Sequence, residues 1–336
     1  MVPHATSKTV LMRGNMGKIT RQASKLHDEA MAILNLDRKL TIDEVEKVYQ
    51  QYNPLADHDV GKGAVFFTPM EIAWEFAVMC QPKGAVIDLC AGIGMLSYNV
   101  LKHDYAGYGS GKPLRGEIKR LVAIEHDPLF VEYGKRLLPE VEWYCANVFD
   151  LDLLLSLGEF DCAISNPPYG NIPSKSEAKW LKVKGPAQWQ VIEIALRMAY
   201  NGGMFIIPEN DSDYSFRINP IDPQNPMPSW MRDFSPQYTD DKNNKEKYLE
   251  PHFPGVIIFP ASVDISYLEA QWVGANPKVA IVDVNVDDVI WERPYGFSDV
   301  LPKPKLIDAP VVKKEKLAKV PKKVKPQPQE YTESMF

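Results

Sequence analysis

A short run of residues, Asn166-Pro167-Pro168-Tyr169, carries the chemical groups needed to bind a planar amine. The side-chain oxygen of Asn166 and the carbonyl oxygen of Pro167 can both accept hydrogen bonds from one NH2 group, and Tyr169 offers a ring for stacking. The two prolines restrict the turn and supply no backbone N–H that would compete for these acceptors. The tetrapeptide 166–169 is therefore a candidate catalytic pocket.

The chemistry suited to this pocket is attack by an amine whose lone pair is delocalised into a neighbouring π-system. Hydrogen bonds from both N–H groups localise the lone pair on nitrogen, so preorganised dipoles stabilise the transition state and no strong general base is needed. Asn-Pro pairs also mark ordinary turns, which leaves a plain turn as the alternative interpretation. The surrounding elements have to decide between the two.

Apolar strand patterns alternate with helical patterns through most of the chain, and one of them leads directly into the tetrapeptide. This alternation predicts the α/β class, with a doubly wound, mostly parallel sheet of seven strands and helices on both faces. In such sheets ligands bind at the carboxyl ends of the strands. The strands are predicted at residues 85–89, 120–124, 141–144, 160–165, 204–207, 256–259 and 279–284.

Three of these strands end in residues suited to a nucleotide-like cofactor. The first leads from Asp88 into a loop in which Gly92 and Gly94 allow close backbone approach, although the spacing differs from the G-x-G-x-x-G of dinucleotide sites. Glu125 ends the second strand and could accept both hydroxyls of a ribose. Asn147 follows the third and could bind an adenine edge. The structural alternatives are a cap for Asp88, a solvated carboxylate for Glu125 and a turn residue for Asn147.

Taken together, these segments resemble the S-adenosylmethionine-dependent methyltransferases, a Rossmann-like fold. The tetrapeptide resembles the NPPY signature of the amino-methyltransferases, chiefly the DNA adenine N6 enzymes. The segment Phe66-Phe67-Thr68-Pro69, followed by a helical run at 70–80, resembles the upstream segment of their γ-type motif order. The resemblance covers about residues 63–207.

The resemblance implies S-adenosylmethionine as cofactor and gives each matching residue a role. Thr68 and Gly92 would face the methionine part, Asp88 its ammonium group, Glu125 the ribose and Asn147 the adenine. An acidic residue is common at the position of Asn147, although an amide can also pair with adenine. The full set of implied cofactor residues is Phe67, Thr68, Pro69, Asp88, Ala91, Gly92, Gly94, Glu125, Asn147 and Val148.

The implied activity is methyl transfer to the N6 amine of adenine in DNA after the base is flipped out of the duplex. Tyr169 would stack on one face of the base, and Phe216 or Phe253 on the other, with core packing as the alternative role for both. Basic residues and tryptophans downstream of the tetrapeptide could follow a nucleic-acid backbone, or could form a solvated face over core tryptophans. These residues are Lys175, Lys179, Lys182, Lys184, Trp180 and Trp189.

Other activities use the same pocket chemistry and stay open. An RNA adenine methyltransferase would need no base extrusion, and a protein glutamine methyltransferase would also act on a planar NH2 group. A non-catalytic subunit of a modification assembly is the alternative without turnover. A partner subunit could supply target recognition, whether the chain belongs to a restriction-modification system or is an orphan methylase.

Composition divides the 336 residues into three parts. We expect a helical extension at 1–62, a methyltransferase domain at 63–300 with an insertion at about 211–251, and a basic, proline-rich, disordered tail at 301–336. Residues 302–326 carry a charge of +7, which leaves −13 for the rest of a chain whose net charge is −6. The tail would either add salt-sensitive affinity for a polyanion or only increase solubility.

Several classes of protein are disfavoured by the composition. The four cysteines are widely spaced, so they indicate buried thiols rather than a disulfide framework or a metal site. The chain begins without the apolar run of a signal peptide, and we expect a cytoplasmic protein of bacterial, plasmid or phage origin with no membrane contact. The glycines at 107–111 suggest a phosphate-binding loop, but Ala106 and Pro113 occupy required positions of that motif.

Overall fold

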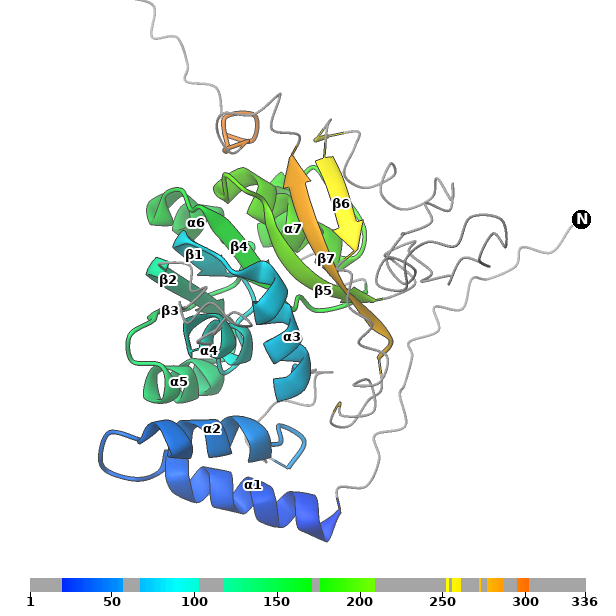
Figure 1. Cartoon of the computed structure of the whole chain (residues 1–336). Helices are drawn as coiled ribbons and strands as arrows, with labels where there is room; N and C mark the ends of the chain where they lie inside the picture. The colour runs from blue at the N-terminus through cyan, green and yellow to red at the C-terminus, as the bar shows by residue number, and fades with distance from the viewer. Residues whose placement is uncertain are drawn as a thin grey trace, which may run out of the picture. The chain divides into compact units, whose positions relative to one another are not determined.

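The centre of the structure is a sheet with the strand order β3-β2-β1-β4-β5-β7-β6 (Figure 1). The computed structural model describes residues 20–56, 67–102, 118–170, 176–208, 252–253, 256–260, 272, 277–286 and 295–301. The strands in chain order are β1 (Gly84–Asp88), β2 (Ile118–Glu125), β3 (Glu142–Cys145), β4 (Cys162–Ser165), β5 (Gly203–Pro208), β6 (Val256–Pro260) and β7 (Val279–Val286).

Strand direction defines the fold class. β1 pairs in parallel with β2 and β4, β3 continues in parallel beyond β2, and β5 does so beyond β4. β7 runs antiparallel to both β5 and β6. The predicted α/β class is therefore confirmed, with a mostly parallel sheet of seven strands. Each predicted strand lies within two residues of an observed one at either end.

Helices cover both faces of the sheet, as a doubly wound arrangement requires (Figure 1). Helices α3, α4 and α5 pack on one face, and α6 and α7 on the other. A short 3-10 helix, η1, lies between the tetrapeptide and α7. The bounds are α1 (Arg21–Leu34), α2 (Ile42–Gln51), α3 (Met70–Cys80), α4 (Met95–Lys102), α5 (Pro128–Leu137), α6 (Leu151–Leu157), η1 (Ser176–Trp180) and α7 (Ala187–Met198).

Alternate strand residues fill two separate cores, because successive side chains of a strand point to opposite faces. Val86, Ile164 and Ile206 belong to the core under α3, α4 and α5. Their chain neighbours Ile87 and Ala163 belong to the core under α6 and α7. Both faces of the central strands are buried, which explains why these strands have continuous apolar sequences instead of alternating ones.

The N-terminal helices begin at side-chain caps that the sequence indicates. Thr41 and Glu44 form a reciprocal capping box at the start of α2. Ala30 of α1 and Val48 of α2 are fully buried and belong to the same core as α3, α4 and α5. The described part of the extension predicted at 1–62 therefore shares the core of the sheet, within a compact unit that runs to Val300.

Several predicted segments lie outside the described residues. They include the glycine-containing loop at 107–113, the insertion at about 211–251 and the tail from residue 302 onward. The proposed domain boundaries stay predictions.

Helix α5 packs closely on β3 at Gly134. A Cβ atom at Gly134 would lie 2.3 Å from the indole of Trp143, whose Nε1 donates to the carbonyl of Leu138 at 3.2 Å. We expect Gly134→Ala to lower the free energy of unfolding by about 1–3 kcal/mol, because overpacking outweighs the gain in helix propensity. Lys135→Ala, at an exposed position of the same helix, should stay within about 0.5 kcal/mol of the wild type in urea denaturation. Equal stability of the two variants would show that the indole can move aside.

Candidate active site

The loop between β1 and α4 turns sharply at two glycines. Gly92 and Gly94 have φ angles of +57° and +94°, which favour glycine. The N–H of Ala91 donates to the carbonyl of Ile124 at 3.0 Å, so the loop is attached to β2. A Cβ at Gly94 would lie 2.9 Å from Leu138, which leaves no room for a larger residue. The loop is thus held close to the carboxyl edge of the sheet, where a ligand can approach its backbone.

A tyrosine of the N-terminal extension forms hydrogen bonds with the backbone of the same loop. The Tyr49 hydroxyl of α2 donates to the carbonyls of Ile93 at 3.1 Å and Gly94 at 3.3 Å. Its ring lies 4.7 Å from that of Tyr98, centroid to centroid, and it is 4% exposed. Sequence reasoning missed this residue, since a buried tyrosine on an amphipathic helix looks like any other core position.

Glu125 is half-buried, and both of its carboxylate oxygens accept hydrogen bonds from backbone N–H groups. Its Oε2 accepts from the N–H of Gly92 at 2.8 Å, and its Oε1 accepts from the N–H groups of His126 and Asp127 at 2.7 and 2.8 Å. These bonds fix the carboxylate next to the glycine loop. The ribose role stays a prediction, and the geometry brings the residue to the position that this role requires.

Asp88 combines full burial with an unused acceptor. It is 0% exposed, and its Oδ2 accepts from the Ser97 hydroxyl at 2.7 Å. The backbone N–H groups of Cys90 and Ser97 also lie close enough to lower its pKa, although neither makes a hydrogen bond of good geometry to Oδ1. Burial raises the pKa of Asp88 to about 7, and the bond from Ser97 opposes this shift. A buried carboxylate with an unused oxygen is costly unless a cation approaches it. The ammonium role of Asp88 stays a prediction.

The end of β3 contributes a turn and an apolar wall. Asn147 Oδ1 accepts from the N–H of Phe149 at 3.1 Å, which is the turn role that we weighed as the alternative. Val148 is 8% exposed. The N–H of Ala146 donates to the carbonyl of Glu125 at 2.9 Å, so this turn lies beside the end of β2. Adenine binding by Asn147 and Val148 stays a prediction.

The tetrapeptide follows β4, the other neighbour of β1. Asn166 Nδ2 donates to Thr68 Oγ1 at 2.9 Å, and the Tyr169 hydroxyl donates to Asn166 Oδ1 at 2.7 Å. The upstream Thr-Pro segment and the tetrapeptide therefore meet, although 98 residues separate Thr68 from Asn166. Burial raises the pKa of Tyr169, so its hydroxyl stays protonated and able to donate.

Hydrogen bonds downstream of the tetrapeptide fix its far end. The N–H of Gly170 donates to Gln188 Oε1 at 3.0 Å, and the Gly170 carbonyl accepts from the N–H of Ala187 at 2.8 Å. Gly170 has a φ angle of +81°, which explains a glycine directly after Tyr169. The tetrapeptide is thus held between β4 and the first turn of α7.

Phe67 and Pro69 lie at the start of α3. Pro69 precedes the first helical residue, and its carbonyl accepts from the N–H of Ala73 at 2.9 Å. A Cβ built on Gly92 would lie 3.6 Å from the Phe67 ring, so this ring approaches the glycine loop. It also meets Phe130 edge-on, with centroids 5.0 Å apart. The upstream segment thus reaches both the glycine loop and the tetrapeptide.

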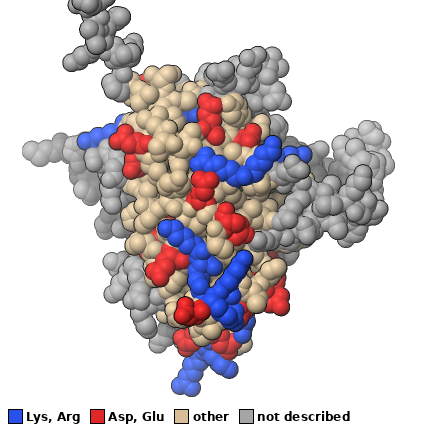
Figure 2. Space-filling view, turned by 90° about the vertical axis from the view of Figure 1, so that its left-hand side faces the viewer, with Lys and Arg blue, Asp and Glu red and all other residues tan. Residues whose placement is uncertain are grey.

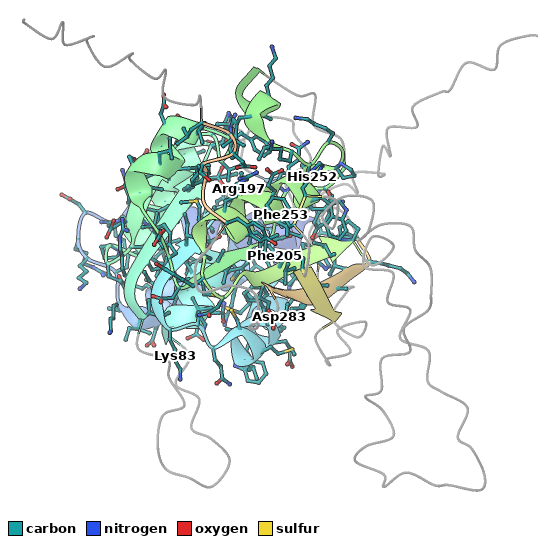
Figure 3. The ribbon with its side chains drawn as sticks, turned by 90° about the horizontal axis from the view of Figure 1, so that it is seen from above. Lys83, Arg197, Phe205, His252, Phe253 and Asp283 are labelled. Carbon is teal, nitrogen blue, oxygen red and sulfur yellow. The ribbon has the colours of Figure 1, made fainter. Side chains whose placement is uncertain are left out.

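The structure corrects one of the two aromatic candidates for the second face of the base. Phe253 is 1% exposed, and the Arg197 guanidinium lies over its ring, 5.2 Å from the ring centroid. The view from above labels the two residues near one another (Figure 3). Arg197 is in the last turn of α7, and the adjacent Met198 accepts from the N–H of Phe160, just before β4. The residues from Phe160 to Asn166 span about 20 Å. Phe253 therefore packs at the amino edge, away from the tetrapeptide.

The two tryptophans downstream of the tetrapeptide also have core roles rather than stacking roles. Trp189 is 1% exposed, and Trp180 Nε1 donates to the Phe149 carbonyl at 2.9 Å. Among the lysines, Lys182 is 3.7 Å from Asp299, and Lys184 donates to carbonyls of its own loop. Lys179 is exposed, and its contact with a substrate stays a prediction. Phe216 and Lys175 lie outside the described residues.

Surface charge is mixed on the face seen in Figure 2, where basic and acidic side chains alternate. Ion pairs such as Arg120–Glu142, at 3.0 Å, are in keeping with this mixture. Within the described ranges, no group of three or more His, Cys, Asp or Glu side chains could hold a metal ion. None of the described helices has the length and apolar content to span a membrane.

Comparison with known proteins gives one curated relative. A release factor glutamine methyltransferase from Mycolicibacterium smegmatis is 36% identical over 125 residues, which are 35% of this chain. The match spans 40% of that relative's length. No protein-family profile matches the chain.

Solved structures with a similar fold include a Listeria monocytogenes protein assigned to the class I S-adenosylmethionine-dependent methyltransferases. It is 15% identical, with a TM-score of 0.41 over 83% of this chain and 92% of that one. A modification subunit assigned to a type I restriction enzyme of Vibrio vulnificus is 14% identical, with a TM-score of 0.40 over 53% of this chain and 42% of that one. With TM-scores of 0.40 and 0.41, these similarities do not bear on the geometry of the site.

The support that Tyr49 gives to the glycine loop leads to a test. We expect Tyr49→Phe to weaken S-adenosylmethionine binding about threefold to tenfold, because the loop loses the hydroxyl that holds its two carbonyls. Tyr98→Phe, which removes the hydroxyl of the neighbouring ring, should change the Kd less than twofold in calorimetric titration. An unchanged Kd for Tyr49→Phe would mean that the loop keeps its shape without this support.

Asp88 predicts a pH-dependent affinity for the cofactor. Its pKa is about 7 without ligand, and an approaching ammonium lowers the pKa, so binding releases a proton. Affinity should rise with pH from about 5 to about 7 and then level off, since Asp88 is ionised at higher pH. The other titratable groups beside Asp88 are Glu125, Cys90 and Tyr49.

The matched control for this titration is Asp88→Asn, which cannot ionise and keeps the shape of the side chain. Its Kd should be higher at pH 8 and should retain only the pH dependence of the ligand's own amine. Parallel Kd–pH curves for wild type and variant would contradict the assignment of Asp88 to the ammonium.

Proposed function

We propose that this chain is an S-adenosylmethionine-dependent N-methyltransferase that acts on a planar NH2 group, with the N6 amine of adenine in DNA as its substrate. The observation that carries the proposal is the placement of Asn166 and Asp88 at the ends of neighbouring strands. Asp88 pairs with Ile164 in β4, two residues before Asn166. Asn166 and Asp88, to which we assign the substrate amine and the cofactor ammonium, therefore lie on the same edge of the sheet.

The residues of the chain divide the work of the reaction. S-adenosylmethionine supplies an electrophilic methyl group when it is bound. Asn166 Oδ1 and the Pro167 carbonyl accept the two N–H bonds of the substrate, which concentrates the lone pair on nitrogen for in-line attack. With the cofactor bound, the nitrogen held by Asn166 and Pro167 would accept the methyl group as that group leaves sulfur, and the methylated amine would then lose one proton to solvent. Tyr169 stacks on the base and excludes water.

Adenine in DNA is supported by the order of the motifs along the chain. The Thr-Pro segment, the glycine loop and the tetrapeptide follow one another as in the γ-type DNA adenine enzymes, and the Thr68–Asn166 hydrogen bond joins the first to the last. A base in duplex DNA has to be flipped out to reach this pocket. An unpaired adenine in RNA fits the same pocket without this step. Target recognition would come from other segments or from a partner subunit.

A second candidate is methylation of a glutamine side chain in a protein. It is favoured by the 36% identity to a release factor glutamine methyltransferase. The amide of glutamine is also planar, and its lone pair is delocalised into the carbonyl, so it needs the same two acceptors. The two acceptors that we assign to the tetrapeptide suit either substrate.

The deciding experiment incubates the protein with methyl-labelled cofactor and three separate substrates. These are mixed-sequence duplex DNA, total RNA and a release factor that carries its glutamine loop. Label in N6-methyladenine of DNA supports the proposal, and label only in RNA or only in glutamine replaces it with that alternative. Cofactor binding with no label in any substrate would favour a non-catalytic modification subunit.

Asn166→Ala is expected to lower kcat by about 100-fold or more, because one of the two preorganised acceptors is lost. The Kd for S-adenosylmethionine should stay within twofold, since Asn166 serves the substrate amine. Asn201→Ala removes the side chain of an exposed asparagine before β5 and should retain wild-type turnover. Full activity of Asn166→Ala would show that the pocket is assigned to the wrong residues.

A further inference from the structure

The Asn166 carboxamide is held at both ends by hydroxyl groups from different parts of the chain. Its Nδ2 donates to Thr68 Oγ1 at 2.9 Å, and its Oδ1 accepts from the Tyr169 hydroxyl at 2.7 Å. Thr68 is 5% exposed, so this bond is protected from competition by water. The sequence resemblance gives Thr68 a different role, at the methionine part of the cofactor.

The two ends of a carboxamide are similar in shape but opposite in hydrogen bonding. Only the oxygen can accept an N–H from a substrate amine, whereas the NH2 end would place donor against donor. Rotation of the Asn166 carboxamide by a half turn would therefore remove an acceptor from the pocket. A productive site needs something that holds the NH2 end away from the substrate.

Thr68 is well placed to hold that end because its own position is rigid. It is followed by Pro69, which fixes the backbone at the start of α3, and Ile72 and Phe76 of that helix are 0% exposed. A β-branched side chain has few χ1 rotamers, so the hydroxyl oxygen is restricted to a small region. The acceptor for Asn166 Nδ2 is thus positioned by the core of the protein.

The Tyr169 hydroxyl has a different status, because it uses the oxygen that the substrate amine needs. When an amine enters, its N–H can take the place of this hydroxyl on Oδ1, and the Tyr169 ring becomes available for stacking. During that exchange the bond to Thr68 still holds the carboxamide. The bond to Thr68 leaves Oδ1 untouched, so it can persist whether or not the Tyr169 hydroxyl stays on that oxygen.

We propose that Thr68 is a positioning residue, which keeps the oxygen of the Asn166 carboxamide turned toward the substrate amine. This inference rests on the proposed amine-methylating function and assigns a new role within that site. It transfers Thr68 from cofactor binding to the orientation of the catalytic amide.

The test compares Thr68→Val, which keeps the shape but cannot accept a hydrogen bond, with Thr68→Ser, which can. We expect Thr68→Val to lower kcat about tenfold while the Kd for S-adenosylmethionine changes less than twofold, and Thr68→Ser to restore most of the activity. Thr20→Val removes the exposed cap of α1 and serves as a control for general loss of stability, with kcat unchanged. In the double variant with Asn166→Ala, the loss should equal that of Asn166→Ala alone.

Other outcomes would overturn the proposal. A raised Kd with unchanged kcat in Thr68→Val would return Thr68 to the cofactor, and a Thr68→Ser variant as inactive as Thr68→Val would indicate packing alone. Additive losses in the double variant would mean that Thr68 acts independently of Asn166.

A measurement that needs no turnover separates this inference from the proposed function. In protein with 15N-labelled asparagine, the side-chain NH2 signal of Asn166 is identified by its loss in Asn166→Ala. Its hydrogen exchange should be slow in the wild type and in Thr68→Ser, and faster in Thr68→Val. Unchanged exchange would overturn the positioning role. If Thr68→Val speeds this exchange but the wild-type protein methylates none of the substrates, Thr68 still positions Asn166. Only the proposed function is then refuted.

Discussion

Parallel pairing of β1 with both of its neighbours is the constraint on which the whole site depends. Asp88 is level with Ala123 of β2 on one side and with Ile164 of β4 on the other. Since the strands are parallel, their carboxyl ends lie at one edge, and the residues that follow them converge there. A slip by one residue would turn the side chains of β1 to the opposite face. The buried apolar residues on both faces of β1 prevent such a slip, so core packing fixes the geometry of the site.

The N-terminal helices extend this dependence to a part of the chain that precedes the sheet. α1 and α2 bury Ala30 and Val48 in the core beneath α3, α4 and α5, and Arg136 of α5 donates to the Leu34 carbonyl at 3.1 Å. The helix that carries Tyr49 is therefore packed firmly on the core, and this packing positions the Tyr49 hydroxyl beside the glycine loop. Helices that are committed to the core in this way are poorly suited to act as a separate, mobile recognition module.

The sequence predicted the elements of the fold well because their signals are local. Continuous apolar runs identified the strands within two residues at either end. Motif order also brought the glycine loop and the tetrapeptide to one edge. These features depend on residues that are close together in the chain, so they can be recognised without knowing which distant segments pack against them.

Side-chain partners were much harder to predict, because they depend on which distant segments meet. Tyr49 has the pattern of an ordinary core residue, and nothing near Thr68 indicates that its partner is Asn166. Phe253 shows the reverse error, since an aromatic residue with no local pattern was a candidate for the pocket and lies in the core at the other edge. The types and spacing of residues along the chain predict the backbone elements well, but they say little about which distant residue a side chain contacts.

The packing roles of the aromatic residues bear on the choice between the proposed substrates. An extruded adenine has two faces to cover, whereas the amide of a glutamine needs the two acceptors and a narrow passage. Among the described residues, Phe253, Trp180 and Trp189 are all used in packing, so none of these three supplies a second face for adenine. For the proposed adenine substrate, the second face of the base has to come from residues other than the buried Phe253 and Trp189.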